Sequence, residues 1–399
     1  MHPPGAGTVL VRYGEVGIKS DQIRTRMETQ LQANIRAILD DRDLPGTVEQ
    51  SHTRLYVQTT PARIDAVTDA VTDAFGVVSA SPALRVEPTM DAICDALADV
   101  TREHYDGSTF AVRAQRAGPP SAHPFSSPEL ERDGGSVVHT AAQEEGYEPT
   151  VDLDDPEMTF SIECRRDDAY VFLDRRDGPG GLPVGTQTPL VALVSGGIDS
   201  PVAAWLAMKR GAPVIPLYVD LGEYGGVDHR MRAIETVESV GRFAPNVDCR
   251  LRVAPGGEGI EQIAGVTEMY RMLVARRFML QIAAAVAEDV GAVGVVTGES
   301  MGQKSSQTTT NLQVTSAAIE LPIHRPLLSM DKPAITDLAR QIGSYDDSTI
   351  DAGCQQLAPD APATQPPLDR IEAAEPDDMA ALAAEAAAAV SVVTGDPSG

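Results

Sequence analysis

The sequence predicts an α/β protein in which a doubly wound parallel sheet forms the C-terminal half and a smaller α+β part precedes it. Short apolar segments alternate with longer helical patterns after Pro189, which is the order that builds a parallel sheet covered on both faces. Before that point strands and helices follow one another at closer spacing. The glycine- and proline-rich run GPGGLPVGTQTP at residues 178–189 marks the expected linker between the two parts.

The N-terminal part divides into two small α+β domains, residues 1–78 and 79–177. Apolar residues alternate in its strands and recur every three to four positions in its helices. The expected elements of the first domain are strands 8–13 and 54–58 with helices 22–39 and 64–74; those of the second are helix 90–104 and strands 110–113, 159–164 and 169–174.

Residues 190–358 contain the repeated strand–helix units of the main domain. Strands are expected at 191–194, 214–220, 250–253 and 293–297, and helices from 201, at 227–240 and at 269–288. In such a sheet, ligands bind beyond the carboxyl ends of the strands. Residues 359–399 are rich in proline, alanine and acids, so we expect a disordered tail apart from an alanine-rich helix at 379–390.

The composition is that of a globular protein with an unusually acidic surface. The net charge is −26 at pH 7, and only four of the 32 basic residues are lysines. A hydrated acidic surface keeps proteins soluble in concentrated salt, so we expect a halophilic source. Such a chain is poorly suited to binding nucleic acids through phosphate contacts, although at high salt nucleic-acid recognition depends on shape, stacking and a few placed arginines instead. No apolar run is long enough to span a membrane and no export signal precedes the first strand, so we expect a cytoplasmic protein.

The four cysteines are too far apart to form a close-spaced zinc or iron–sulfur site. Cys94 and Cys164 lie in helical and strand patterns, where a buried cysteine acts as a small apolar residue. Cys249 stands at the head of a strand, which favours packing. Cys354 differs because it lies in the loop DAGCQQ at 351–356, where a thiol is exposed and available as a nucleophile.

The run LVALVSGGIDSP at residues 190–201 is the most informative segment. A buried strand is followed by Ser195, Gly196 and Gly197, and glycine lets the backbone turn sharply and approach a ligand closely. Asp199 or Ser200 can cap the helix that follows. The free amides at the helix start form a nest for an anion such as pyrophosphate. The alternative without a ligand is an ordinary glycine-rich turn between a strand and a helix. Neither the Walker pattern nor the dinucleotide-binding fingerprint fits the chain.

The segment SGGIDS at 195–200 resembles the PP-loop of ATP pyrophosphatases, which split ATP between its α and β phosphates and adenylate a substrate. Several further segments resemble tRNA 4-thiouridine synthetases: VRYGEVGIK at 11–19, TGESMGQKSSQT at 297–308 and PIHRPL at 322–327. Residues 80–175 look like a THUMP domain, a module that binds RNA, behind a ferredoxin-like domain. The resemblance implies ATP-dependent sulfur transfer to uridine 8 of tRNA, giving 4-thiouridine.

The resemblance also implies which residues bind ATP. The loop with its strand end would hold the pyrophosphate, and a second set would hold the rest of the nucleotide. The first set is Leu193, Val194, Ser195, Gly196, Gly197, Ile198, Asp199 and Ser200; the second is Tyr218, Val219, Arg276, Gly298 and Gln307. Asp199 is both a catalytic candidate and a candidate Mg²⁺ ligand, because its carboxylate lies beside the phosphates. The alternatives to a role in ATP binding are purely structural: helix capping for Asp199, strand packing for Tyr218 and Val219, and a solvated helix position for Arg276.

By the same resemblance Cys354 is the working cysteine, carrying a persulfide or acting through a disulfide. Many members end in a rhodanese domain that this sequence replaces with the acidic tail, so sulfur is expected from a separate carrier, a cysteine desulfurase or free sulfide. Cys249 is the other cysteine of the domain and so the candidate resolving thiol. The resemblance leaves open a homodimer, another adenylating reaction such as 2-thiolation, an amide-forming ligase, sulfur transfer for thiamine thiazole synthesis, or an RNA-binding scaffold.

Overall fold

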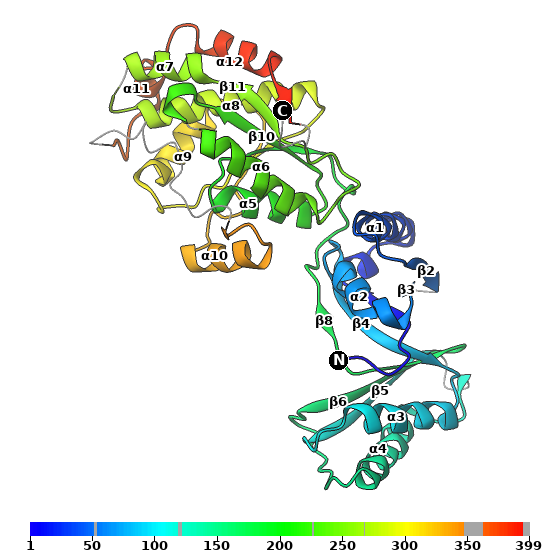
Figure 1. The fold of residues 1–399 in the computed structure, drawn as a ribbon. Coiled ribbons are helices and arrows are strands. Elements are labelled where there is room, and N and C mark those ends of the chain that lie inside the picture. The colour runs from blue at the N-terminus through cyan, green and yellow to red at the C-terminus, as the bar shows by residue number, and fades with distance from the viewer. Residues whose placement is uncertain (52–53, 119–121, 226, 267, 347–361, 394–399) are drawn as a thin grey trace. The chain divides into compact units, whose positions relative to one another are not determined.

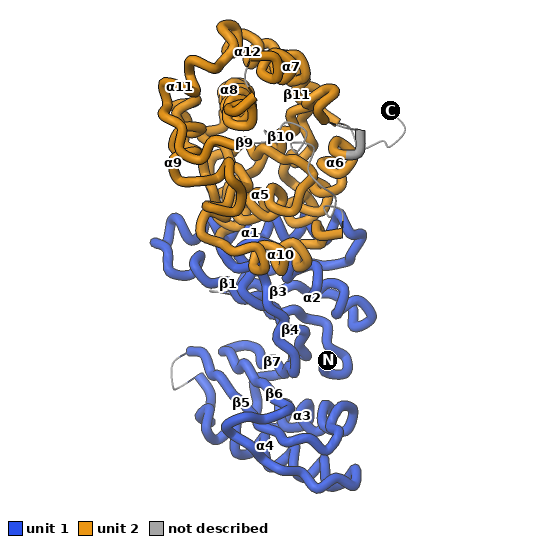
Figure 2. The backbone as a smooth tube through the Cα atoms, turned by 90° about the vertical axis from the view of Figure 1, so that its left-hand side faces the viewer, with its two compact units in different colours: residues 1–181 blue, residues 182–399 orange. Residues whose placement is uncertain are grey.

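The computed structural model describes residues 1–51, 54–118, 122–225, 227–266, 268–346 and 362–393. They form two compact units, residues 1–181 and 182–399 (Figures 1 and 2). None of the described helices is both long and apolar enough to cross a membrane.

Unit 1 is built on one continuous sheet with the strand order β2-β3-β1-β4-β7-β6-β5, and β8 pairs with β4. Its strands are β1 (Thr8–Tyr13), β2 (Thr47–Ser51), β3 (Arg54–Gln58), β4 (Val77–Val86), β5 (Phe110–Arg116), β6 (Met158–Cys164), β7 (Ala169–Phe172) and β8 (Arg176–Asp177). Its helices are α1 (Asp21–Asp41), α2 (Ile64–Thr72), α3 (Met90–His104) and α4 (Ser127–Glu144), with short 3-10 turns at Glu15–Ile18 and Pro61–Arg63.

Two apolar cores lie between this sheet and its helices. Leu31, Ile35 and Val67 pack α1 and α2 against β1 and β3, while Ile93 and Leu130 pack α3 and α4 against β5 and β6. Because side chains alternate across a strand, residues between the core positions point to the opposite face, which we call the helix-free face. The ten-residue strand β4 runs through both halves, so the expected domain boundary at 78/79 falls inside a strand.

Unit 2 contains the expected doubly wound sheet, with the order β13-β12-β9-β10-β11-β14. All neighbours are parallel except β11 and β14. The strands are β9 (Leu190–Leu193), β10 (Val214–Asp220), β11 (Arg252–Pro255), β12 (Val295–Val296), β13 (Ile323–His324) and β14 (Ser391–Val392). The helices are α5 (Asp199–Lys209), α6 (Val227–Gly241), α7 (Gly257–Val266), α8 (Arg271–Asp289), α9 (Thr309–Ser316), α10 (Lys332–Gln341), α11 (Leu368–Glu372) and α12 (Met379–Ala388), with 3-10 turns at Gly222–Tyr224 and Ser305–Gln307. In Figure 1, α5 and α6 lie on one side of β10 and β11, and α7, α8 and α12 lie on the other.

The C-terminal segment differs from the disordered tail that its composition suggested. Met379 and Leu382 of α12 are buried in the same core as Phe278 of α8, and Ile371 of α11 is fully buried there. Strand β14 then pairs with β11. Alanine-rich helices expose little polar surface, so α12 can cover α8 closely although its composition resembles that of an unfolded segment.

The expected linker is also largely ordered. Gly178 and Gly180 hydrogen-bond to Val78 and Val77 in unit 1, whereas Leu182 and Gly185 hydrogen-bond to Lys209 and Gly211 in unit 2. The two ends of the linker therefore belong to different units, and its glycines supply positive φ angles of 66° at Gly180 and 94° at Gly185.

Candidate functional site

The loop that follows β9 takes a tight turn against α6. Gly196 has a φ of +66°. A side chain there would also meet the Cβ of Arg232 at 2.9 Å and the carbonyl oxygen of His229 at 3.0 Å. Both the backbone conformation and the close approach thus require glycine, as the sequence pattern suggested.

Helix α5 starts at Asp199, so Ile198 is its N-cap and no side chain caps it. The expected capping role of Asp199 or Ser200 is therefore wrong. The Ser200 hydroxyl instead accepts a hydrogen bond from the amide of Ser195 at 3.2 Å, which closes the loop on itself. The amides of Gly196, Gly197 and Ile198 have no acceptor among the described residues. These amides lie at a helix start, which is the arrangement that suits an anion, and the binding of pyrophosphate there stays a prediction.

A second loop, after β12, reaches the same place. A Cβ on Gly298 would lie 2.8 Å from the carbonyl carbon of Asp199 and 2.9 Å from the amide nitrogen of Ser200. The strand order runs outward from β9 in both directions, through β12 on one side and β10 on the other, so the β9 and β12 loops flank the point where the strand order reverses, which is where ligands bind in sheets of this kind. The structure thus brings Gly298 to the SGGIDS loop, and only glycine allows this approach.

Lys332, the first residue of α10, forms an ion pair with Asp199. Its ammonium nitrogen lies 2.8 Å from Asp199 Oδ1, and the side chains are 46% and 23% exposed. The Asp199 carboxylate is therefore paired with a half-exposed cation from another helix. The sequence does not predict this pair, because nothing local links residues 133 positions apart.

Arg276 on α8 is held by a buried carboxylate rather than solvated. Glu299 accepts from Arg276 at 2.7 Å and from Arg325 at 2.7 Å, and the Thr297 hydroxyl donates to it at 3.1 Å. The Glu299 side chain is only 11% exposed. Glu299 follows a buried strand in the sequence, and a charged residue in that position is a signal that could have found it. Its two arginine partners come from other elements, so the sequence does not predict them.

The remaining predicted nucleotide residues fall into two groups. Gln307 is buried, and its side-chain oxygen lies 3.4 Å from the amide of Ser300, so it shapes the loop after β12. Tyr218 and Val219 on β10 are buried in two different cores, and Val194 is buried beside Tyr218.

Three of the four cysteines lie in the described part of the chain. Cys354 lies outside the described residues. Cys249 lies at the amino edge of the sheet, where its Sγ is 3.8 Å from the carbonyl of Val214, at the start of β10. Burial raises the pKa of Cys249 to about 11 and that of Cys164 to about 11, and burial also raises the pKa of Cys94. The carboxyl-edge loops lie at the other end of β10, so the structure does not bring Cys249 to them.

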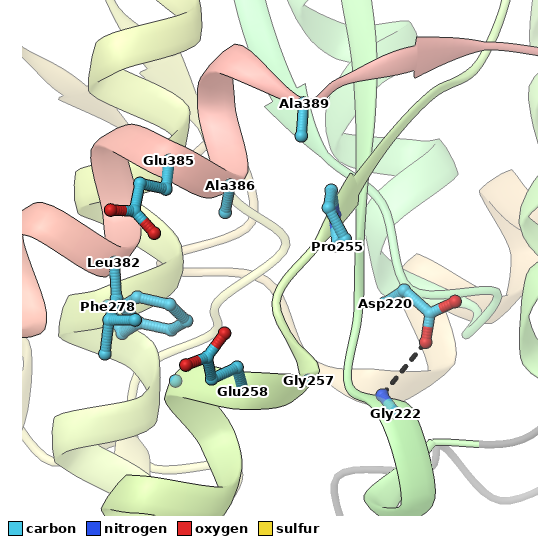
Figure 3. Close-up of a pocket in the computed structure, with 11 residues that line it drawn as sticks. Asp220, Gly222, Pro255, Gly257, Glu258, Phe278, Leu382, Glu385, Ala386 and Ala389 are labelled. Carbon is cyan, nitrogen blue, oxygen red and sulfur yellow. Dashed lines mark hydrogen bonds between the residues drawn. The ribbon is translucent and has the colours of Figure 1, made fainter.

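A separate hollow of about 460 Å³ opens beyond β10 and β11, under α12 (Figure 3). Its charged lining is acidic, with Asp220, Glu258 and Glu385. Figure 3 shows the carboxylates of Glu258 and Glu385 on the same side of the hollow as the Phe278 ring, while Asp220 accepts a hydrogen bond from the amide of Gly222 at 3.0 Å. Negative side chains repel phosphate groups, so this hollow is poorly suited to the phosphates of a nucleotide.

Comparison with known proteins identifies the family. Three family models match in order: a ThiI ferredoxin-like domain at residues 8–81, a THUMP domain at 87–174, and thiamine biosynthesis protein (ThiI) at 185–379. A Halobacterium salinarum protein named "Probable tRNA sulfurtransferase" is 55% identical over 378 residues, covering 94% of this chain and 95% of its own. The chain belongs to the tRNA sulfurtransferase family.

Other tRNA sulfurtransferase relatives agree. One from Methanosarcina acetivorans is 38% identical and covers 91% of this chain and 87% of its own. A solved 4-thiouridine synthetase in complex with RNA and bound ATP is 27% identical, with a TM-score of 0.84 over 98% of this chain and 100% of that chain. The predicted family and fold class are confirmed, whereas the roles of individual residues stay predictions.

Proposed function

We propose that this protein uses ATP to replace the 4-oxygen of uridine 8 in tRNA with sulfur. The observation that carries this proposal is the SGGIDS loop, whose amides at 196–198 have no acceptor in the part of the chain that the structure describes, with the β12 loop at Gly298 packed against it. A loop of this kind binds a chain of phosphates through backbone donors and a helix start. The family membership supplies tRNA as the substrate class.

Two chemical steps follow. The uracil 4-oxygen attacks the α-phosphorus of ATP, pyrophosphate leaves, and the base becomes adenylated. A sulfur nucleophile then attacks C4, a C–S bond forms, and AMP departs with the former 4-oxygen. Sulfur suits this displacement because an ionised thiol or persulfide is strongly nucleophilic. We assign the persulfide-carrying role to Cys354, to which a separate carrier or a cysteine desulfurase in the cytoplasm transfers a persulfide sulfur. The outer sulfur of this persulfide attacks C4, and a second thiol then attacks the Sγ of Cys354 and breaks the S–S bond, which leaves the sulfur on the base and Cys354 in a disulfide that external thiols reduce. Free sulfide would attack C4 directly, without Cys354.

The pyrophosphate end of ATP is assigned to the amides of Gly196, Gly197 and Ile198, with Lys332 beside them. Arg276 and the backbone at Tyr218 and Val219 are assigned to the rest of the nucleotide. Mg²⁺ enters with ATP and is held mainly by phosphate oxygens and water, so one carboxylate, that of Asp199, fits its needs. When bound, it neutralises charge on the departing pyrophosphate. Asp199 also orients Lys332 toward the phosphates, at the 2.8 Å distance of their ion pair.

The test is release of pyrophosphate that depends on tRNA. Asp199→Ala should lower the rate by at least about a hundredfold, which is a typical effect of losing one electrostatic group in an active site. Because Asp199 makes no capping hydrogen bond, the variant should stay folded. The control is Asp337→Ala, an exposed aspartate on α10. Equal rates for wild type and Asp199→Ala would refute the assigned role, and absence of 4-thiouridine from the products of the wild type would refute the reaction.

A further inference from the structure

The helix-free face of unit 1 gathers three arginines around a single carboxylate, with a fourth arginine beside one of them. Glu163 on β6 is only 4% exposed. Its carboxylate lies 2.7 Å from Arg165, 3.0 Å from Arg54 and 3.7 Å from Arg12, measured to a guanidinium nitrogen in each case. Arg175 lies close enough to Arg12 to lower its pKa electrostatically. Four guanidinium groups against one carboxylate leave three positive charges in one place, on a chain whose net charge is −26.

The arginines are held in fixed positions by the sheet. Arg12 donates to the Ser81 hydroxyl at 2.9 Å and lies 4.9 Å above the Phe172 ring, and Arg175 donates to the Ser79 hydroxyl at 2.9 Å. Burial, and then repulsion by the other arginines, lowers the pKa of Arg12 to about 10, so it stays charged at neutral pH. Fixed guanidinium groups lose little entropy when they bind an anion.

Neighbouring carboxylates do not neutralise this cluster. Glu28 accepts hydrogen bonds from Tyr13 at 2.5 Å and Gln50 at 2.7 Å, and Asp168 is paired with Arg85 at 2.6 Å. Within the described residues, Glu163 is the one carboxylate that pairs with Arg12, Arg54 and Arg165. An excess of buried positive charge is unfavourable by itself, so the arrangement is best explained by an anionic ligand.

We propose that Arg12, Arg54, Arg165 and Arg175 form a site for the phosphate groups of the tRNA backbone. The inference rests on the proposed function, which makes tRNA the substrate, and it adds the surface that holds the tRNA. Tyr56 and Tyr170 stack on each other with ring centroids 5.2 Å apart and are 3% exposed, so they support the arginines and are closed to bases. The site therefore binds backbone phosphates and does not distinguish the base sequence of the tRNA.

Arginine suits this task in concentrated salt. Counterion release contributes little to binding there, so affinity depends on directed hydrogen bonds. The planar guanidinium forms paired hydrogen bonds with phosphate, which a lysine ammonium does not.

The experiment uses the full-length protein and a labelled tRNA transcript, with dissociation constants measured by fluorescence anisotropy over a range of KCl concentrations. Arg175→Gln removes an exposed arginine that contributes little to folding, and it should weaken binding about threefold to tenfold. Arg54→Gln/Arg175→Gln should weaken it further. The slope of log Kd against log salt should fall by about one for each arginine removed.

The matched control is Arg176→Gln, which removes the same charge one residue further along. Arg176 pairs with three carboxylates, Asp65, Asp69 and Asp174, so it carries no excess charge, and tRNA affinity should stay within about twofold of wild type. ATP affinity should be unchanged in every variant. Wild-type affinity for tRNA in the double variant, or in Arg175→Gln if Arg54→Gln fails to fold, would overturn the site while leaving the proposed function intact. Failure of the wild type to bind tRNA would overturn the proposed function itself.

Discussion

Glu299→Gln tests whether one buried carboxylate holds two arginines of the site in place. The substitution keeps the size of the side chain but replaces a carboxylate, which accepts hydrogen bonds from both guanidinium groups, with an amide. The amide oxygen can accept from one guanidinium group, and the amide NH₂ must then face the other. The side chains of Arg276 and Arg325 are 18% and 12% exposed, so water reaches them poorly. Removing one partner of a buried ion pair costs about 3–5 kcal/mol, and the hydrogen bond that remains reduces this to about 2–3 kcal/mol.

A loss of that size should lower the thermal unfolding midpoint of unit 2 by roughly 5–10 °C for a domain of this length. The measurement is differential scanning calorimetry in concentrated KCl. The control is Asp337→Asn, whose exposed pair with Arg340 on α10 should contribute no more than about 0.5 kcal/mol. Glu299→Gln/Arg325→Gln should lose less than the sum of the two single variants, because the carboxylate and guanidinium are coupled. A midpoint shift no larger than that of Asp337→Asn would refute the reasoning.

Three further predictions concern the sulfur step and the C-terminal segment. Cys354→Ser should abolish 4-thiouridine formation from a persulfide carrier while leaving ATP binding intact, because adenylation precedes sulfur attack; normal product from that donor, measured by nucleoside mass spectrometry, would exclude the role. Cys249 should react with iodoacetamide more slowly than an unfolded thiol at mildly alkaline pH, as mass spectrometry can show. Burial raises the pKa of Cys249 to about 11, so the folded state favours the neutral thiol. The resulting contribution to the free energy of unfolding is complete below about pH 9 and is lost as the pH rises toward 11. Met379→Ala should lower the unfolding free energy by about 2–4 kcal/mol in denaturant titrations, because this side chain is 2% exposed, whereas a disordered tail would show no change.

Local sequence was sufficient to predict the glycine turn and helix start at residues 195–200 and the fold class. The strand before Ser195, the glycines and the helix after them are all decided by neighbours in the chain, so the pattern SGGIDS could be interpreted without a structure. The parallel order of unit 2 followed from the alternation of strands and helices in the same way. Outside the expected helix at 379–390, the composition of residues 362–393 was misleading, because a segment rich in proline, alanine and acids still folds when its few apolar side chains, such as Ile371, pack into a neighbouring core.

Tertiary structure alone decided which distant charges meet. Lys332 lies 133 residues from Asp199, and Arg276 and Arg325 reach Glu299 from different elements. The arginine cluster is an even clearer case, since Arg12, Arg54 and Arg165 come from three segments that are separate in the chain, and all three meet at Glu163. The spacing of apolar residues shows which face of a helix or strand is buried. The sequence around a single charged residue does not show which residue it pairs with. Strand order and helix packing assign that partner, and those depend on contacts between residues far apart in the sequence.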